Sequence, residues 1–427
     1  MDRFTVSHCL DAGAWVHVPH DAASSRPLDE LLRRPRGWQH PMQFKSQDAA
    51  CPGIGAHFPR REWRPASTDC ALESPIDGTY AGLFADASRP VDVIVLGDSV
   101  SAQWLNALVG VAATNPALSS LAFARGEAEM SRRLLPFNMR LLPRTVDGGL
   151  FLLRQIAWPL HPPGVHPRRV VIANPGPHYH TGPLCAFPRF TNSTRICAVL
   201  EAERAKGAPP PVLSNDDPSR CSVSPAVRKG VPPWWGLCSS VRQALGLASV
   251  DAYRDDLGAF LGAAERWRGE THNATLLWLE MAPQHFWPTS GVRGGPAFKG
   301  NAGKAAGCTS NCCSQSALQF LPPLDAWHPT IRSRCSEVHA LKDVHNASDD
   351  CRRALSNWQN EQARPQLAAR GVALVPIMEA LRSRFDLHPA ADCTHFCEKS
   401  EASLHVAKAV LNTLAVQLQH HHQHAAG

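Results

Sequence analysis

The chain has few tyrosines, no long apolar segment and no dense cluster of basic residues. It holds three tyrosines among 427 residues, against twelve tryptophans. No window approaches the ~18 consecutive apolar residues of a membrane-spanning helix, and residues 1–20 lack a basic stretch followed by an apolar run. Neither a membrane anchor nor a signal peptide is visible in this sequence. The net charge of +6 is spread without a Lys/Arg block, so nucleic acid is not the expected partner.

Cysteine, by contrast, is abundant. The fourteen cysteines run from Cys9 to Cys397, too many and too scattered for an ordinary cytosolic enzyme, so we predict oxidised pairs. Paired CxxC spacing is missing, even at Cys308-x3-Cys312-Cys313, which favours a disulfide loop over a metal cluster. We predict no metal site. Asn-x-Ser/Thr triplets at Asn192, Asn273 and Asn346 are predicted glycosylation sites and agree with a secretory-pathway protein.

Hydrophobic patterning predicts an α/β fold. Strand-like and helix-like segments alternate, which implies a parallel sheet covered on both faces. The expected strands are 92–97, 168–174, 274–281 and 371–378, and the expected helices are 101–112, 251–268, 351–369 and 400–418.

The same patterning divides the chain into three regions. Residues 1–85 are predicted to form an irregular, disulfide-containing lobe packed on a catalytic domain at 86–418. Insertions at about 181–245 and 284–345 interrupt that domain, and we expect these long loops to build the substrate groove. The His-rich residues 419–427 are predicted to be a disordered tail.

A candidate nucleophile lies at the end of the first predicted strand. In VDVIVLGDSVSAQW (91–104), an apolar run ends in Gly-Asp-Ser and then opens into a helix-like segment. A serine at such a strand-to-helix turn has an exposed hydroxyl and free backbone N–H groups beside it, as a serine acyl-transfer enzyme requires. Ser99 is therefore the candidate nucleophile.

The base and its carboxylate are predicted close to the C-terminus. Asp392 and His395 in ADCTHFC follow a strand-like run and precede a periodic helix, so His395 is the candidate base and Asp392 the group that orients it. A second Asp-x-x-His pair, Asp325 and His328, stays open as an alternative, although it lies among prolines and reads as loop.

Five segments in the same order resemble one branch of the SGNH (GDSL-like) hydrolases. The branch is the PC-esterase and trichome-birefringence-like proteins of plants, which include xylan acetyltransferases. The segments are FPRREWRPASTDCAL (58–72), the Gly-Asp-Ser motif, VVIANPG (170–176) followed by His178 and Tyr179, LLWLEMAPQHF (276–286), and DCTHFC (392–397).

The chain also departs from that pattern. The plant proteins have an Arg shortly before a Ser-Pro-x-His-Phe block, whereas Leu279 and Glu280 occupy that region here and Ala282 replaces the Ser. A Gly-Pro pair and a Trp-Asn pair after the last cysteine are missing. The resemblance is therefore to a divergent member, which leaves the acyl donor and acceptor open.

The resemblance implies a three-layer α/β/α SGNH-like fold and a set of site residues. Ser99, His395 and Asp392 would form the triad, and Gly97, Ser99 and the side-chain amide of Asn174 would form the oxyanion hole. Asn174 as a simple turn residue is the alternative. Substrate contacts are expected from Asp98, Trp104, His178, His285 and Trp287, with core packing as the simpler reading of any single Trp or His.

The expected function is O-acetyl transfer to a hydroxyl of a cell-wall-type polysaccharide such as xylan, through an acyl-serine intermediate. An acetyl donor, of which acetyl-CoA is one candidate, would be a substrate rather than a bound cofactor. The Golgi lumen is the expected location, with secretion as the alternative. Two further functions stay open: a carbohydrate acetylesterase, and a glycan-binding protein on an inactive esterase scaffold. The oligomeric state is not predicted.

Overall fold

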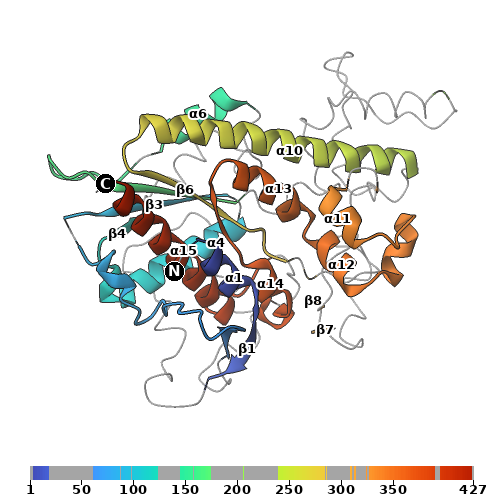
Figure 1. Cartoon of the computed structure of the whole chain (residues 1–427), viewed down its shortest axis with the longest axis horizontal. Coiled ribbons are helices and arrows are strands. Elements are labelled where there is room, and N and C mark those ends of the chain that lie inside the picture. The colour runs from blue at the N-terminus through green and yellow to red at the C-terminus, as the bar shows by residue number, and fades with distance from the viewer. Residues whose placement is uncertain are drawn as a thin grey trace. The chain divides into compact units, whose positions relative to one another are not determined.

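A parallel sheet of five strands forms the centre of the fold, in the order β4-β3-β5-β6-β9 (Figure 1). Its strands are β3 (Val91–Leu96), β4 (Leu121–Phe123), β5 (Arg168–Ala173), β6 (Ala274–Leu279) and β9 (Ala373–Val375). The structure, a computed structural model, describes residues 3–18, 61–86, 88–97, 99–123, 145–156, 158–174, 205, 239–283, 285, 308–309, 312–313, 324, 327–389 and 395–425.

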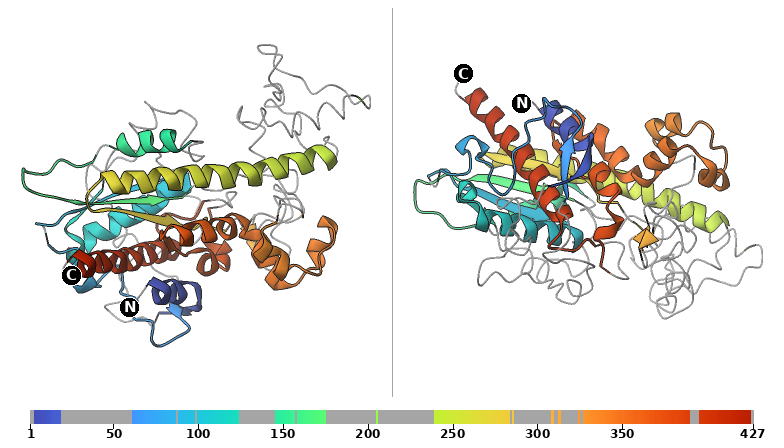
Figure 2. Two further views of the ribbon diagram at one scale, coloured as in Figure 1. Left: turned by 45° about the horizontal axis from the view of Figure 1, so that its top comes forward. Right: turned by 90° about the horizontal axis from the view of Figure 1, so that it is seen from below.

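Helices flank this sheet, as the alternating pattern predicts. β3, β5 and β6 are rich in Val, Ile, Leu and Ala, the composition of strands buried on both faces. Val93, Val95 and Ile172 pack with α4 (Ser99–Thr114) and α15 (Glu401–Ala425). Helix α6 (Val146–Arg154) and the C-terminal part of α10 (Ser239–Glu270) lie on the opposite face (Figure 2).

Other helices differ from their predicted bounds for local reasons. Helix α10 begins at Ser239, and the helix expected over 351–369 is divided into α12 (Asp349–Ser356) and α13 (Trp358–Ala369). Asn357 separates the two with φ −109° and ψ 16°, outside helical values, where asparagine is better tolerated than most residues. The strand expected over 371–378 is shorter because Pro376 has no N–H for a sheet hydrogen bond.

The N-terminal lobe is more regular than predicted. It contains α1 (Arg3–Asp11) and an antiparallel pair of strands, β1 (Gly13–His17) and β2 (Arg61–Pro65). Val6 and Leu10 of α1 belong to the same hydrophobic core as α4 and α15. A disulfide between Cys9 and Cys70 closes the lobe. Helix α1 therefore contributes apolar side chains to this core.

The prediction of a disordered tail is wrong for residues 419–425. Helix α15 continues through Ala425. Its last residues are Gln, His and Ala, which cost a helix little, and no proline or glycine stops it before Gly427.

The chain divides into two compact units. The first comprises residues 1–176, 259–316 and 364–427, and it holds the sheet; the second comprises 177–258 and 317–363. The second unit draws on both predicted insertions and on residues beyond them. Smaller elements are β7 (Cys308–Thr309), β8 (Cys312–Cys313), α11 (Pro329–Arg334), α14 (Met378–Arg382) and the 3-10 helices η1 (Tyr80–Gly82), η2 (Pro116–Leu118), η10 (Leu341–Asn346) and η11 (Phe385–Leu387).

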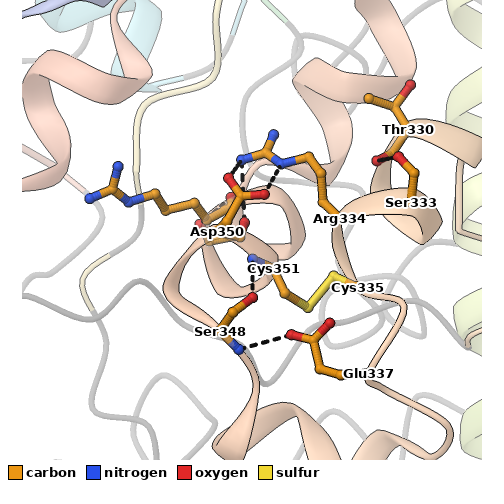
Figure 3. The surroundings of a disulfide bond; sticks show 10 residues. Thr330, Ser333, Arg334, Cys335, Glu337, Ser348, Asp350 and Cys351 are labelled. Carbon is orange, nitrogen blue, oxygen red and sulfur yellow. Dashed lines mark hydrogen bonds and ion pairs between the residues drawn. A yellow bond between two sulfur atoms is a disulfide. The ribbon is translucent and has the colours of Figure 1, made fainter.

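A disulfide joins the short helices of the second unit. Cys335 follows α11 and is bonded to Cys351 in the first turn of α12 (Figure 3). Beside it, the Arg334 guanidinium donates to both carboxylate oxygens of Asp350 at 2.9 and 2.6 Å. The two disulfides confirm that cysteines pair in this chain, and Cys397 is disulfide-bonded as well. None of the helices among the described residues is long and apolar enough to cross a membrane.

His405 of α15 is buried where the N-terminal lobe meets the core. Its ring lies edge-on to the Trp15 and Trp63 rings, at centroid distances of 5.6 and 5.7 Å. Neither ring nitrogen has a hydrogen-bond partner among the described residues. Burial, and secondarily the charge of Lys408, lowers the pKa of His405 to about 3. The folded protein therefore holds this imidazole neutral.

This burial predicts an acid-sensitive contact. The unfolded chain takes up a proton on His405 near its ordinary pKa and the folded chain does not, so its contribution is present at neutral pH and lost as pH falls. Between about pH 7 and about pH 5 the loss is roughly 2 kcal/mol. Urea unfolding at the two pH values should show this loss in wild type and a smaller one in His405→Phe. Equal pH dependence in both proteins would contradict the assignment.

Candidate active site

The candidate nucleophile lies where the predicted strand-to-helix turn is observed. β3 ends at Leu96, Gly97 follows, and Ser99 is the first residue of α4. The backbone N–H groups in the first turn of this 16-residue helix point out of its N-terminal end and carry the positive end of its dipole. A developing negative charge beside Ser99 would be stabilised there. Asp98 lies outside the described residues.

The strand order makes this turn a natural ligand-binding position. If the five strands are renumbered by their order in the sequence, their order across the sheet is 2-1-3-4-5. The chain therefore passes from β3 to β4 on one side, and the later strands β5, β6 and β9 lie on the other side of β3. Ligands of such sheets bind beyond the carboxyl ends of the strands where this direction changes. That point lies between β3 and β5, where Ser99 and Asn174 follow the two strands.

Gly97 allows the ends of β3 and β5 to approach each other closely. A Cβ built on Gly97 would overlap the Ser101 side chain and the Asn174 carbonyl oxygen. The backbone N–H of Asn174 also donates to the carbonyl of Leu96 at 2.9 Å. The φ angle of Gly97 is not in the left-handed region, so backbone conformation does not require a glycine here. The glycine is required because no Cβ fits between the two strand ends.

The side chain of Asn174 is buried and held in place. Its Nδ2 donates to the Glu280 carbonyl at 2.7 Å, and the residue is 2% exposed. A tethered amide beside the Ser99 turn is the arrangement that an oxyanion donor needs, and the oxyanion role of Asn174 stays a prediction.

The loop carrying His395 is attached directly to α4. Gln103, one helical turn after Ser99, donates from Nε2 to the Phe396 carbonyl at 2.9 Å. The Trp104 and Phe396 rings also pack at a centroid distance of 5.6 Å. His395 itself is 6% exposed. The helix that begins at the candidate nucleophile thus holds the residue next to the candidate base, while Asp392 lies outside the described residues.

A chain of contacts between two buried histidines supports the same loop. His285 Nδ1 lies 2.7 Å from His388 Nε2, and His388 Nδ1 lies 2.6 Å from the His395 carbonyl oxygen. At the far end, His285 Nε2 lies 2.8 Å from the Arg382 carbonyl oxygen. Burial lowers the pKa of His285 to about 4.

Two of the predicted substrate contacts are corrected by these positions. Trp104 is 1% exposed and His285 is 0% exposed, so both side chains are enclosed by protein. Their apolar ring surfaces are satisfied by packing against Phe396, which is the simpler reading that the sequence left open. His178 and Trp287 lie outside the described residues.

The remaining predicted residues are spread over the structure. Asn273 and Asn346 are exposed, in agreement with glycosylation, which stays a prediction; Asn192 lies outside the described residues. His328 belongs to the second unit, where its Nδ1 accepts from the Thr330 N–H and caps α11. Its predicted partner Asp325 is also outside the described residues.

Sequence reasoning missed a buried carboxylate that organises this edge of the sheet. Glu280 directly follows β6 and is 0% exposed. Its Oε2 accepts from the N–H groups of Ile377 and Met378, both at 3.0 Å, and its Oε1 pairs with Arg364. Burial raises the pKa of Glu280. Burial, and secondarily the negative charge of Glu280, raises the pKa of Asp11 to about 7. The available signal was an acid placed directly after six apolar or hydroxyl residues.

One hollow on the described residues lies away from Ser99. It has a volume of about 620 Å³ and is lined by Glu265 and residues 268–274, at the C-terminal end of α10 and the beginning of β6. Ser99 lies at the opposite ends of the strands, so this hollow is not the predicted site. Among the described residues, no group of three or more His, Cys, Asp or Glu side chains is placed to hold a metal ion.

The Gly97 contact gives a direct test of the site's geometry. Gly97→Ala should push the β3–α4 turn away from Asn174 and lower the free energy of unfolding by about 1–3 kcal/mol, the usual cost of overpacking. Gly269→Ala is the matched control, because a Cβ there meets no atom within 4 Å. Urea unfolding of both variants measures the difference. A Gly97 variant as stable as the Gly269 variant would show that the close approach is not required.

Comparison with known proteins does not identify a family for this chain. No protein-family model, no curated protein and no solved structure matches the chain. The resemblance to the PC-esterase and trichome-birefringence-like proteins therefore rests on the sequence segments alone and stays a prediction.

Proposed function

We propose that this protein transfers an O-acyl group, most simply acetyl, to a hydroxyl of a polysaccharide such as xylan through an acyl-Ser99 intermediate. One observation carries the proposal. Ser99 opens α4 at the carboxyl end of β3, at the point in the strand order where sheets of this type bind ligands. The loop of His395 is tied to the same helix by Gln103.

In the first half of the reaction, the Ser99 hydroxyl attacks the carbonyl carbon of the acyl donor. His395 accepts the hydroxyl proton as the new C–O bond forms, and Asp392 stabilises the resulting imidazolium. The negative charge moves to the carbonyl oxygen, where N–H groups at the start of α4 and the Asn174 amide are the proposed donors. Collapse of this intermediate breaks the bond to the leaving group, which takes the proton from His395.

The second half repeats these steps with a sugar hydroxyl as the nucleophile. His395 removes its proton, the sugar oxygen attacks the acyl carbon, and the bond to Ser99 breaks as Ser99 regains the proton. Water in place of the sugar would give ester hydrolysis with the same residues. The choice between transferase and esterase is therefore a choice of acceptor, and the sequence resemblance favours the sugar.

The test is to trap and then discharge the intermediate. The purified chain is exposed briefly to an activated acetyl ester, with and without xylan oligosaccharide, and analysed by intact mass and peptide mapping. We expect one acetyl group on the Ser99 peptide, discharged faster with the oligosaccharide than in buffer, and no acetyl on that peptide in Ser99→Ala.

Ser333→Ala controls for loss of an exposed serine hydroxyl, because Ser333 lies on α11 of the second unit. It should behave as wild type. Equal discharge with and without sugar would identify an esterase instead. No adduct in wild type, together with retained binding of the oligosaccharide, would reject the enzyme and favour a glycan-binding protein.

A further inference from the structure

The contacts around His388 are unusually short and almost closed to solvent. A series of contacts runs from the Arg382 carbonyl through the His285 and His388 rings to the His395 carbonyl. The successive donor–acceptor distances are 2.8, 2.7 and 2.6 Å. His285 is 0% exposed and His388 is 3% exposed. Phe396 covers the His388 ring at a centroid distance of 4.2 Å. Three segments, at 285, 382–388 and 395–396, are thereby held together.

Counting the protons on the two imidazoles shows which ring nitrogen must be protonated for the contact to His395. Both ends are carbonyl oxygens, which only accept, so three hydrogen bonds across four ring nitrogens need three protons. Two neutral imidazoles carry two. Burial opposes the third, as the pKa of about 4 for His285 indicates. The charged groups around His285 are Arg382, which opposes its protonation, and Asp386, which favours it. Because a carbonyl oxygen cannot donate, the contact to His395 requires the proton of His388 to be on Nδ1. The proton of His285 then serves one of its two contacts, and when it is on Nδ1 it is donated to His388 Nε2.

We propose that His388, braced by His285, is a positioning residue that donates from Nδ1 to the His395 carbonyl and so sets the direction of the His395 side chain. This inference rests on the proposed function, since it gives the catalytic base its place. The same segment is fixed by the Cys397 N–H, which donates to the Leu387 carbonyl at 2.7 Å. These two contacts hold the His395 carbonyl and the Cys397 N–H, and so they fix the backbone from His395 to Cys397.

Three substitutions of His388 separate the effect of hydrogen-bond donation from the effect of side-chain size. Asn places an amide donor near the Nδ1 position, Gln places it near the Nε2 position, and Phe keeps the ring without any donor. With the activated acetyl ester as substrate, we expect His388→Asn to retain kcat within about threefold. His388→Gln and His388→Phe should lose about tenfold to 100-fold in kcat with little change in KM, the size of effect that a misplaced catalytic group produces.

His405→Phe is the control for loss of a buried histidine, because His405 packs against the N-terminal lobe rather than the His395 loop. Its kcat should equal that of wild type. Equal kcat in the Asn, Gln and Phe variants of His388 would overturn the proposal. If the Phe variant does not fold, the Asn and Gln pair decides, since both carry the same amide and Gln places it one methylene group farther from the backbone.

A second measurement does not need activity. Amide hydrogen exchange at Cys397, followed by mass spectrometry, should stay slow in wild type and His388→Asn and become faster in His388→Gln. If wild type forms no acyl-Ser99 but exchange follows this order, the positioning role stands and the proposed function fails. If wild type is active and exchange is equal in all variants, the positioning role fails and the proposed function stands.

Discussion

The close approach of Gly97 to Asn174 is the constraint on which the rest of the site depends. It brings the carboxyl ends of β3 and β5 within backbone contact, so that the N-terminus of α4 and a buried amide face the same region. Any larger residue at Gly97 would separate them. The parallel sheet supplies the strand ends, and the glycine allows them to converge on one place where a reacting carbonyl can be held.

Buried polar groups act together with apolar packing to hold the loops at this edge. Glu280 ties β6 to the beginning of α14 through two backbone N–H groups, and its own carbonyl receives the Asn174 amide. Gln103 and His388 each contact the backbone of the loop that contains His395 and Phe396. Such groups are costly to bury unless they are paired, and each pairing is directional. Directional pairing therefore restricts the position of these loops more closely than apolar contact alone would.

Much of the fold was predictable because its signals are local. The strands at 91–96, 168–173 and 274–279 are mostly apolar, and a parallel sheet buried on both faces favours such composition. Ser99 and Asn174 were found because each follows a strand directly. Where prediction was wrong the cause was also local: Pro376 shortened the last strand, Asn357 divided a helix, and the polar end of α15 continued as helix for want of a stop signal.

The sequence by itself determined the α/β alternation, the positions of Ser99, Asn174 and His395 along the chain, and the presence of disulfides, because each depends on residue type and near neighbours. Only the tertiary structure decided which polar groups meet. His388 and His285 are 103 residues apart, and Arg364 and Glu280 are 84 apart. Trp104 lies in the core rather than at a sugar-binding surface because Phe396 covers it. Contacts of this kind depend on how separate segments pack, and no spacing along a single chain encodes them.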